Sequence, residues 1–307
     1  MEKLFNEIIE YIKKNHFNSH LINWEKIEKE EINTKKDIVI YLEKKLLPKL
    51  RDNHHSNFRI NINNRIYTNR YNHIYRKSLF KKYYIKPEKY FSEIPQIKVF
   101  NNILYINAPR TWNQEYWIEY YNIINNALKN YQNYNGIIFD LSECLGGYYA
   151  PIIAPFYQIF GKTIIAHGYN QNFKTNCFTH ILVKGKNNDP DSWIKQIKFN
   201  PNKISDNKQS SIKIIIITSS YTGSAGEFAT LFFKNRNNVI IIGEKTAGLT
   251  TWQNIHYLKS DPKSYLNIGI AFSIDRNNLS YNKKFYIKPD YITSNPIKKA
   301  IKLINSL

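Results

Sequence analysis

Apolar residues in the first 49 positions recur at the spacing of a helix. The segments with this pattern are residues 3–16, 21–31 and 35–49. Thr34 stands immediately before the third segment, where a residue that caps a helix N-terminus is favoured. We therefore expect residues 1–49 to form a small helical bundle, which would act as a cap on the following domain.

The pattern changes to a period of two after Phe58, as it does in a strand. Residues 60–95 are polar and rich in tyrosine, which predicts a hairpin or a flap. Residues 97–106 predict two short strands, and the apolar positions of 115–131 predict a helix. We expect residues 50–307 to form the main domain, with the candidate flap near its start.

Two similar strand–loop–helix units follow in the middle of the chain. Each has a continuous apolar run, typical of a strand buried on both faces, and then a short loop and a helix. A third apolar run comes directly after the second helix. This alternation predicts an α/β core with parallel strands, and sites in such cores lie at the carboxyl ends of the strands. The predicted strands are 136–141, 212–218 and 239–242, and the predicted helices are 149–160 and 224–235.

A serine lies at the second of these strand ends. The segment Thr222–Glu227 reads Thr-Gly-Ser-Ala-Gly-Glu and puts Ser224 at the start of a helix, with small neighbours that leave room for a substrate. The amide of Ala225 would point at an oxyanion formed on an attacked carbonyl. Ser224 and Glu227 also fit a helix-capping box, and this hexapeptide alone favours capping over catalysis.

Two further features would complete a catalytic site around Ser224. Gly146 and Gly147 follow the first strand, and paired glycines let the backbone approach a ligand and offer it N–H groups, although a tight turn is the simpler explanation. The serine also needs a base of near-neutral pKa, which histidine provides. His54 and His55 lie where the helical part meets the first strand, although an isolated histidine is more often a surface residue.

Read together, these segments resemble the C-terminal processing peptidases, also called tail-specific proteases, which form family forty-one of the serine peptidases. The likeness is closest to the branch with the nisin-resistance protein and tricorn-type cores. It implies a ClpP/crotonase-like spiral α/β core and a peptidase that needs no metal or cofactor. The blocks that carry it are 136–161 with its Gly-Gly turn, 214–251 with the serine turn and a Gly-Glu-x-Thr-x-Gly loop, 271–292 with a closing Pro-Asp, and the weaker Arg-Asp-Asn-His-His-Ser-Asn-Phe segment.

The resemblance also implies roles for residues of this chain. Ser224 would be the nucleophile, and the backbone of Ala225 and of the Gly146-Gly147 turn would form the oxyanion hole. His55 matches the His-Ser pair of the branch, whereas His54 fits the spacing to the preceding aspartate. Both histidines stay open as the base, and His55 is preferred. The expected substrate is a peptide or the C-terminal region of a protein.

Some positions depart from the family pattern. Leu249 occupies the place of the family's lysine base, which excludes a Ser–Lys pair there because leucine cannot accept a proton. Lys283 stands where tricorn-type enzymes have an orienting glutamate; Asp275 is a candidate substitute, with a turn residue as the alternative. Ser142 and Cys144 replace an arginine and an asparagine. A catalytically inactive peptide-binding homologue is therefore the main alternative function.

Composition changes this picture little. The net charge of +20, from 44 Lys and Arg against 24 Asp and Glu, raises a nucleic-acid-binding protein as a less favoured alternative. The basic residues are dispersed, which favours compositional drift. Cys144 and Cys177 form neither a CxxC pair nor a disulfide framework, and the N-terminus has no apolar signal core. We therefore expect a cytoplasmic protein without a transmembrane segment.

Overall fold

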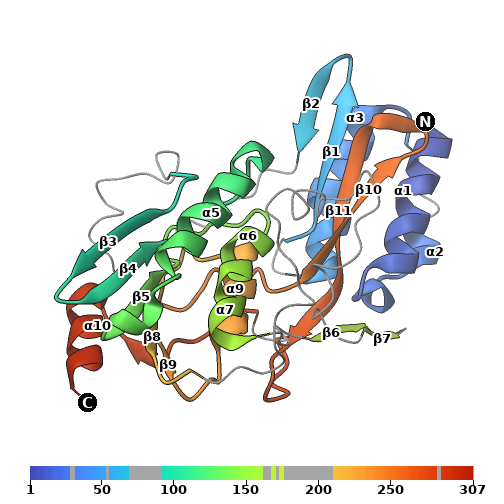
Figure 1. The fold of residues 1–307 in the computed structure, drawn as a ribbon. Coiled ribbons are helices and arrows are strands. Elements are labelled where there is room, and N and C mark those ends of the chain that lie inside the picture. Colours follow the sequence, from blue (N-terminus) through green and yellow to red (C-terminus); the bar gives the residue numbers. More distant parts are fainter. Residues whose placement is uncertain are drawn as a thin grey trace.

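The computed structural model describes residues 1–27, 32–52, 55–68, 92–161, 167–170, 173–175, 210–281 and 285–306. Two six-stranded sheets organise this part of the chain: one lies beside the N-terminal helices, at the right of Figure 1, and the other lies at the left, beside the C-terminal helix. No helix among these residues is long and apolar enough to cross a membrane.

The described residues among the N-terminal fifty are mostly helical, as their periodicity predicts, whereas residues 28–31 of the expected 21–31 helix lie outside the described part. The helix near residue 35 begins at Thr34, whose hydroxyl accepts a hydrogen bond from the Asp37 amide while the Asp37 carboxylate accepts one from the Thr34 amide (2.7 Å). Its buried face continues through two further turns of helix to Leu50. The elements are α1 (Glu2–Asn15), η1 (Ser19–Leu21), α2 (Trp24–Ile27), α3 (Lys35–Tyr41), η2 (Leu42–Leu46) and η3 (Leu47–Leu50).

The first sheet packs against these helices and shares one hydrophobic core with them. Ile8 and Leu42 from the helices lie in the same cluster as Phe58, Leu266 and Ile268 from the strands. The strand order is β2-β1-β11-β6-β7, and β10 also pairs with β11. The strands are β1 (Asn57–Ile62), β2 (Arg65–Thr68), β6 (His167–Asn170), β7 (Phe173–Thr175), β10 (Trp252–Leu258) and β11 (Asp261–Ile274).

The described start of the candidate flap is a hairpin. Strands β1 and β2 are antiparallel, and Asn63 and Asn64 between them both have positive φ, which suits a tight hairpin turn. Residues 69–91, which make up most of the candidate flap, lie outside the described part of the chain.

The second sheet contains the predicted parallel strands. Its order is β12-β9-β8-β5-β4-β3, and all neighbouring pairs are parallel except β3 with β4. The parallel α/β core expected from the sequence is therefore confirmed. The strands are β3 (Gln96–Phe100), β4 (Ile103–Asn107), β5 (Gly136–Asp140), β8 (Lys213–Thr218), β9 (Val239–Gly243) and β12 (Tyr291–Ile292).

Helices cover both faces of this sheet, which explains why its central strands β5 and β8 are mostly apolar (Figure 1). Ile137 and Ile216 face the helices of the main core, whereas Ile138 and Ile215 face α10. The helical elements are η5 (Gln114–Tyr116), α5 (Trp117–Ala127), η6 (Tyr131–Asn133), α6 (Ala150–Ile153), η7 (Ala154–Phe156), α7 (Tyr157–Phe160), α9 (Ala225–Phe233) and α10 (Pro296–Asn305).

Candidate active site

Ser224 stands between the carboxyl end of β8 and the first turn of α9. Its backbone has φ 50° and ψ −111°, a conformation that side-chain-bearing residues rarely adopt. A sharp strand-to-helix turn with a strained serine is the geometry by which hydrolases expose a nucleophilic hydroxyl above a sheet. The observed strain at Ser224 therefore supports a functional role in addition to capping.

The Glu227 carboxylate lies under this turn and is fully buried. It accepts hydrogen bonds from the amides of Ser224 (3.2 Å), Gly248 (2.8 Å) and Leu249 (2.5 Å), and from the Thr246 hydroxyl. Burial raises the pKa of Glu227 to about 7, although these four donors favour the carboxylate form. Glu227 thus completes the capping box and also ties the serine turn to the 246–249 loop.

The serine turn is bonded to the turn that follows β5. The Gly223 amide donates to the Cys144 carbonyl (2.9 Å), and the Thr222 hydroxyl donates to the Leu141 carbonyl (2.9 Å). The two turns approach so closely that a Cβ at position 226 would lie 2.5 Å from the Cys144 oxygen, which explains the glycine there. Cys144 itself is buried, and burial raises the pKa of its thiol to about 12.

Gly146 and Gly147 lie directly beside Ser224. Both have positive φ (132° and 111°), and a Cβ built on Gly146 would lie 3.2 Å from Ser224 Cβ and 3.7 Å from its Oγ. A Cβ on Gly147 would lie 2.3 Å from the Thr111 carbonyl oxygen, so this position requires glycine. Within the described part of the chain, the amides of Ala225 and Gly147 have no hydrogen-bond acceptor. These two N–H groups are therefore available donors for an oxyanion.

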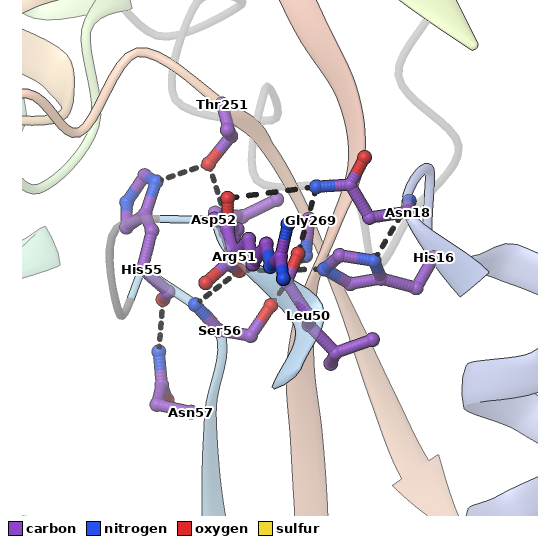
Figure 2. A network of polar contacts seen from close by, with 11 residues as sticks. His16, Asn18, Leu50, Arg51, Asp52, His55, Ser56, Asn57, Thr251 and Gly269 are labelled. Atoms are coloured by element: carbon purple, nitrogen blue, oxygen red, sulfur yellow. Dashed lines mark hydrogen bonds and ion pairs between the residues drawn. The ribbon is translucent and has the colours of Figure 1, made fainter. Parts of the chain in front are cut away.

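His55 precedes β1 and is 5% exposed. Its Nδ1 lies 2.6 Å from Thr251 Oγ1, a contact that fixes the ring (Figure 2). Burial lowers the pKa of His55 to about 4, although the charge of Asp52 opposes this shift. The imidazole is therefore neutral at pH 7, which is the form that a general base needs.

Side chains from remote segments hold the loop that carries His55 (Figure 2). The buried Asp52 carboxylate accepts a hydrogen bond from the Ser56 amide (2.8 Å) and lies 3.4 Å from Nε2 of His16. Although burial would raise it, contacts with His16 and Ser56 hold the pKa of Asp52 below its usual value. Ser56 Oγ in turn accepts a hydrogen bond from the Gly269 amide in β11 (2.9 Å). The N-terminal helices thus help to position His55.

A single stretch of chain links the serine and the histidine. Leu249 donates its amide to Glu227, and its side chain lies 3.3 Å from the place of a Cβ on Gly223. Thr251, two residues later, contacts His55. No hydrogen bond joins the described side chains of Ser224 and His55. His54 lies outside the described residues, so the choice between the two histidines stays a prediction.

Asp275, the candidate orienting acid, is bonded to residues other than His55. Its buried carboxylate accepts hydrogen bonds from Asn235 (3.1 Å), the amides of Asn277 and Leu279, and Tyr281 (3.3 Å). The contact with Asn235 lies past the C-terminal end of α9, a nine-residue helix of about 14 Å that begins directly after Ser224. Asp275 is therefore a turn residue in this structure and does not contact His55. Lys283 lies outside the described residues.

Sequence reasoning missed the residues that orient His55. Thr251 belongs to the Gly-Leu-Thr-Thr stretch after the position of the family's lysine, but nothing in a threonine pair marks a histidine partner. His16 and Asp52 are 36 positions apart and meet only because the helices pack on β11. No group of three or more His, Cys, Asp or Glu that could hold a metal occurs among the described residues.

Sequence comparison identifies relatives of the chain. The family model described as Peptidase family S41 matches residues 102–293, which is more than half of the chain. The nisin-resistance protein of Lactococcus lactis subsp. lactis is 30% identical over 216 residues. That alignment covers 69% of this chain and 63% of the relative, so this chain spans less than two thirds of the relative's length.

Solved structures support the fold. A lipoprotein from Streptococcus agalactiae has a TM-score of 0.74 at 19% identity, and the match covers 99% of this chain and 96% of that one. A candidate peptidase from Parabacteroides merdae has a TM-score of 0.59 at 13% identity, with the same two coverages. The predicted α/β peptidase fold with a small helical N-terminal part is confirmed.

Proposed function

The chain belongs to peptidase family S41, and from this premise we propose that it is a serine peptidase that cleaves peptide bonds through an acyl-enzyme on Ser224. The observation that carries the proposal is the strained Ser224 at the N-terminus of α9, with Gly146 against its hydroxyl. A serine that only capped the helix would need neither the positive φ nor a facing turn with an unbonded amide.

The base in this proposal is His55. The Thr251 oxygen already accepts a hydrogen bond from Gln253 (2.9 Å) and would accept a second from the protonated Nδ1 of His55. This tautomer leaves Nε2 of His55 unprotonated, so it can take the proton of the Ser224 hydroxyl. Thr251 then plays the orienting part that a carboxylate plays in other serine hydrolases.

The reaction follows from these positions. As His55 takes the proton, Ser224 Oγ attacks the peptide carbonyl, and the amides of Ala225 and Gly147 stabilise the negative oxygen that forms. The imidazolium gives its proton to the leaving amine, and a water activated by the same histidine releases the acyl group. The scheme uses no metal or cofactor.

The substrate class proposed is a peptide or the C-terminal region of a protein. The name of the Lactococcus lactis relative associates that protein with resistance to nisin, so nisin is one peptide to be tested for cleavage. We propose a cytoplasmic location because the two cysteines form no disulfide framework, and cell fractionation would check it.

Reaction with a fluorophosphonate probe tests the proposal. The probe should label Ser224 in the folded protein, and Ser224→Ala should abolish labelling. His55→Ala should slow labelling on the order of 10²-fold or more, because no base would remain to activate the hydroxyl. Peptide mapping by mass spectrometry would identify the labelled residue.

His54→Ala is the matched control, because it removes the neighbouring imidazole and should leave labelling near the wild-type rate. The reverse order of the two histidine variants would move the base to His54. No labelling of the wild-type protein, under conditions that label a control peptidase, would favour a non-catalytic peptide-binding protein, which Leu249 at the place of the family's lysine also suggests.

A further inference from the structure

The imidazole of His55 is oriented by a hydroxyl group, which carries no charge. Thr251 Oγ1 lies 2.6 Å from its Nδ1. In serine hydrolases with an aspartate partner, the carboxylate both orients the ring and stabilises the imidazolium that forms when the histidine takes a proton. A threonine can make the first of these contributions but not the second, so the proposed base needs a negative charge from another group.

The Asp52 carboxylate is a buried acid in the loop that carries His55. Asp52 is 1% exposed and precedes the histidine by three residues. The His55 amide donates a hydrogen bond to the Asp52 carbonyl oxygen (3.3 Å), and a bond between residues i and i+3 closes a turn in which the two Cα atoms lie within about 7 Å. Both residues belong to one network of polar contacts (Figure 2). The turn therefore puts a carboxylate close to the imidazole.

This carboxylate is ionised at neutral pH. Burial alone would raise the pKa of Asp52, but the contacts with His16 and Ser56 outweigh burial and hold the pKa below its usual value. Oδ2 accepts a hydrogen bond from the Ser56 amide (2.8 Å) and lies 3.4 Å from Nε2 of His16. The other oxygen, Oδ1, is buried and has no hydrogen-bond partner in the described part of the chain. Asp52 thus carries a full negative charge in the interior, and only one of its two oxygens is hydrogen-bonded.

His16 does not neutralise this charge. Nδ1 of His16 accepts a hydrogen bond from the Asn18 amide (3.0 Å), so this nitrogen carries no proton. The imidazole of His16 is therefore neutral, with its proton on Nε2, which faces Asp52. Among the described residues, Asp52 forms no ion pair with a lysine or an arginine. A buried carboxylate without a cationic partner lowers stability, and such charges are concentrated at functional sites.

We infer that Asp52 supplies the negative charge that stabilises the His55 imidazolium during the reaction, while Thr251 orients the ring. This inference rests on the proposed peptidase function. Burial lowers the pKa of His55 and the charge of Asp52 opposes that shift, which is the sign that the inference requires. Two charges interact more strongly in a buried site than in water. Asp52 acts through His55 and not on the substrate, so it is a positioning residue.

Asp52→Asn removes the charge and keeps the contacts. The asparagine oxygen can replace Oδ2, and its amide group takes the place of Oδ1, which has no partner to lose. Labelling of Ser224 by the fluorophosphonate probe should slow on the order of tenfold or more, while circular dichroism stays unchanged. An equal labelling rate in Asp52→Asn and the wild type would overturn the inference.

Asp290→Asn is the matched control for the loss of one carboxylate. Asp290 also accepts a hydrogen bond from a backbone amide, that of Ile241 (2.8 Å), but it does so at β9 of the second sheet. Its replacement should leave labelling at the wild-type rate. An equal slowing in both variants would show that the loss of net charge, and not the place of Asp52, causes the effect.

The pKa of His55 is a second readout, which does not need the chemistry of Ser224. NMR titration of the histidine-labelled chain between pH 7 and 4, with His55→Gln to assign the signal, should show a lower pKa in Asp52→Asn than in the wild type, because the imidazolium has lost its counter-charge. A merely structural role of Asp52 would leave this pKa unchanged, and that result would contradict the inference. A lower pKa together with no labelling of the wild-type protein would instead count against the proposed function and support the effect of Asp52 on His55.

A second pair of variants serves if Asp52→Asn does not fold. Asp52→Glu and Asp52→Gln have side chains of the same size and differ in charge. Asp52→Glu should label Ser224 on the order of tenfold faster than Asp52→Gln. Equal rates in this pair would show that the charge at position 52 has no part in the reaction.

Discussion

The turn that carries Ser224 is held by hydrogen bonds to the adjoining turns of the parallel sheet, whereas the loop that carries His55 is held by contacts with the N-terminal helical part and the first sheet. Backbone bonds join the serine turn to the turn after β5, and both turns end neighbouring parallel strands. The loop that carries His55 depends on three side chains. His16 follows the end of α1, Asp52 lies at the start of the loop itself, and Ser56 lies directly before β1. The two halves of the candidate site therefore depend on different parts of the fold.

This difference has a thermodynamic consequence. The serine half is built into the most deeply buried sheet, so a change there should affect folding and chemistry together. The histidine half sits where the N-terminal helices meet β11, and a change there should alter the position or charge of one imidazole while the main core stays intact. Substitutions on the two sides should separate these outcomes.

The largest effect is expected at Gly147. In Gly147→Ala the new Cβ would overlap the Thr111 carbonyl at 2.3 Å and the residue would keep a φ of 111°. Backbone strain and overlap together should lower the free energy of unfolding by about 4 kcal/mol or prevent folding. Urea denaturation followed by circular dichroism measures this loss.

Gly146→Ala is the matched comparison on the same turn. Its Cβ would lie 3.2 Å from Ser224 Cβ, a contact that small shifts can relieve, so the loss of stability should be smaller. The added methyl group would, however, crowd the hydroxyl and block reaction with the fluorophosphonate probe. If Gly147→Ala folded with wild-type stability, the close approach of Gly147 to the Thr111 carbonyl would be wrong.

The difference between the halves also explains what could be predicted from the sequence. Apolar runs such as 136–141 and 212–218 define buried strands, and the glycines and serine at their ends mark the turns that meet at one sheet edge. The contact between His16 and Asp52 has no such signature, because it depends on how the helices pack against the first sheet. The position of Asp275 could not be predicted from the sequence either, because its turn folds back on the end of α9.

The next effect is the pH dependence of stability that comes from His55. The unfolded chain takes up a proton at His55 near pH 6.5, whereas the folded protein does so only near pH 4, because the imidazole is buried. Between these values acidification therefore favours unfolding. His55 should cost the wild-type protein about 3 kcal/mol of stability as the pH falls from 7 to 4.

The variant His55→Gln isolates this contribution, because glutamine does not titrate. Denaturation curves at pH 7, 5.5 and 4 should show a shallower loss of stability in the variant than in the wild type. His20→Gln, in an exposed position, is the control and should follow the wild-type curve. Parallel pH dependence of the wild type and His55→Gln would contradict a buried neutral imidazole.

The smallest effect is expected at Thr251, which should act on the chemistry and little on folding. Thr251→Val keeps the shape of the side chain but removes the oxygen that His55 Nδ1 contacts at 2.6 Å. Without that acceptor the tautomer with a free Nε2 loses its preference, so the labelling rate of Ser224 should fall roughly tenfold to a hundredfold. Thr251→Ser restores the oxygen and should recover most of the rate. An effect on packing alone would appear in Thr251→Ser, which loses the methyl group but keeps the oxygen. If Thr251→Ser labelled as slowly as Thr251→Val, the orienting role of Thr251 would be ruled out.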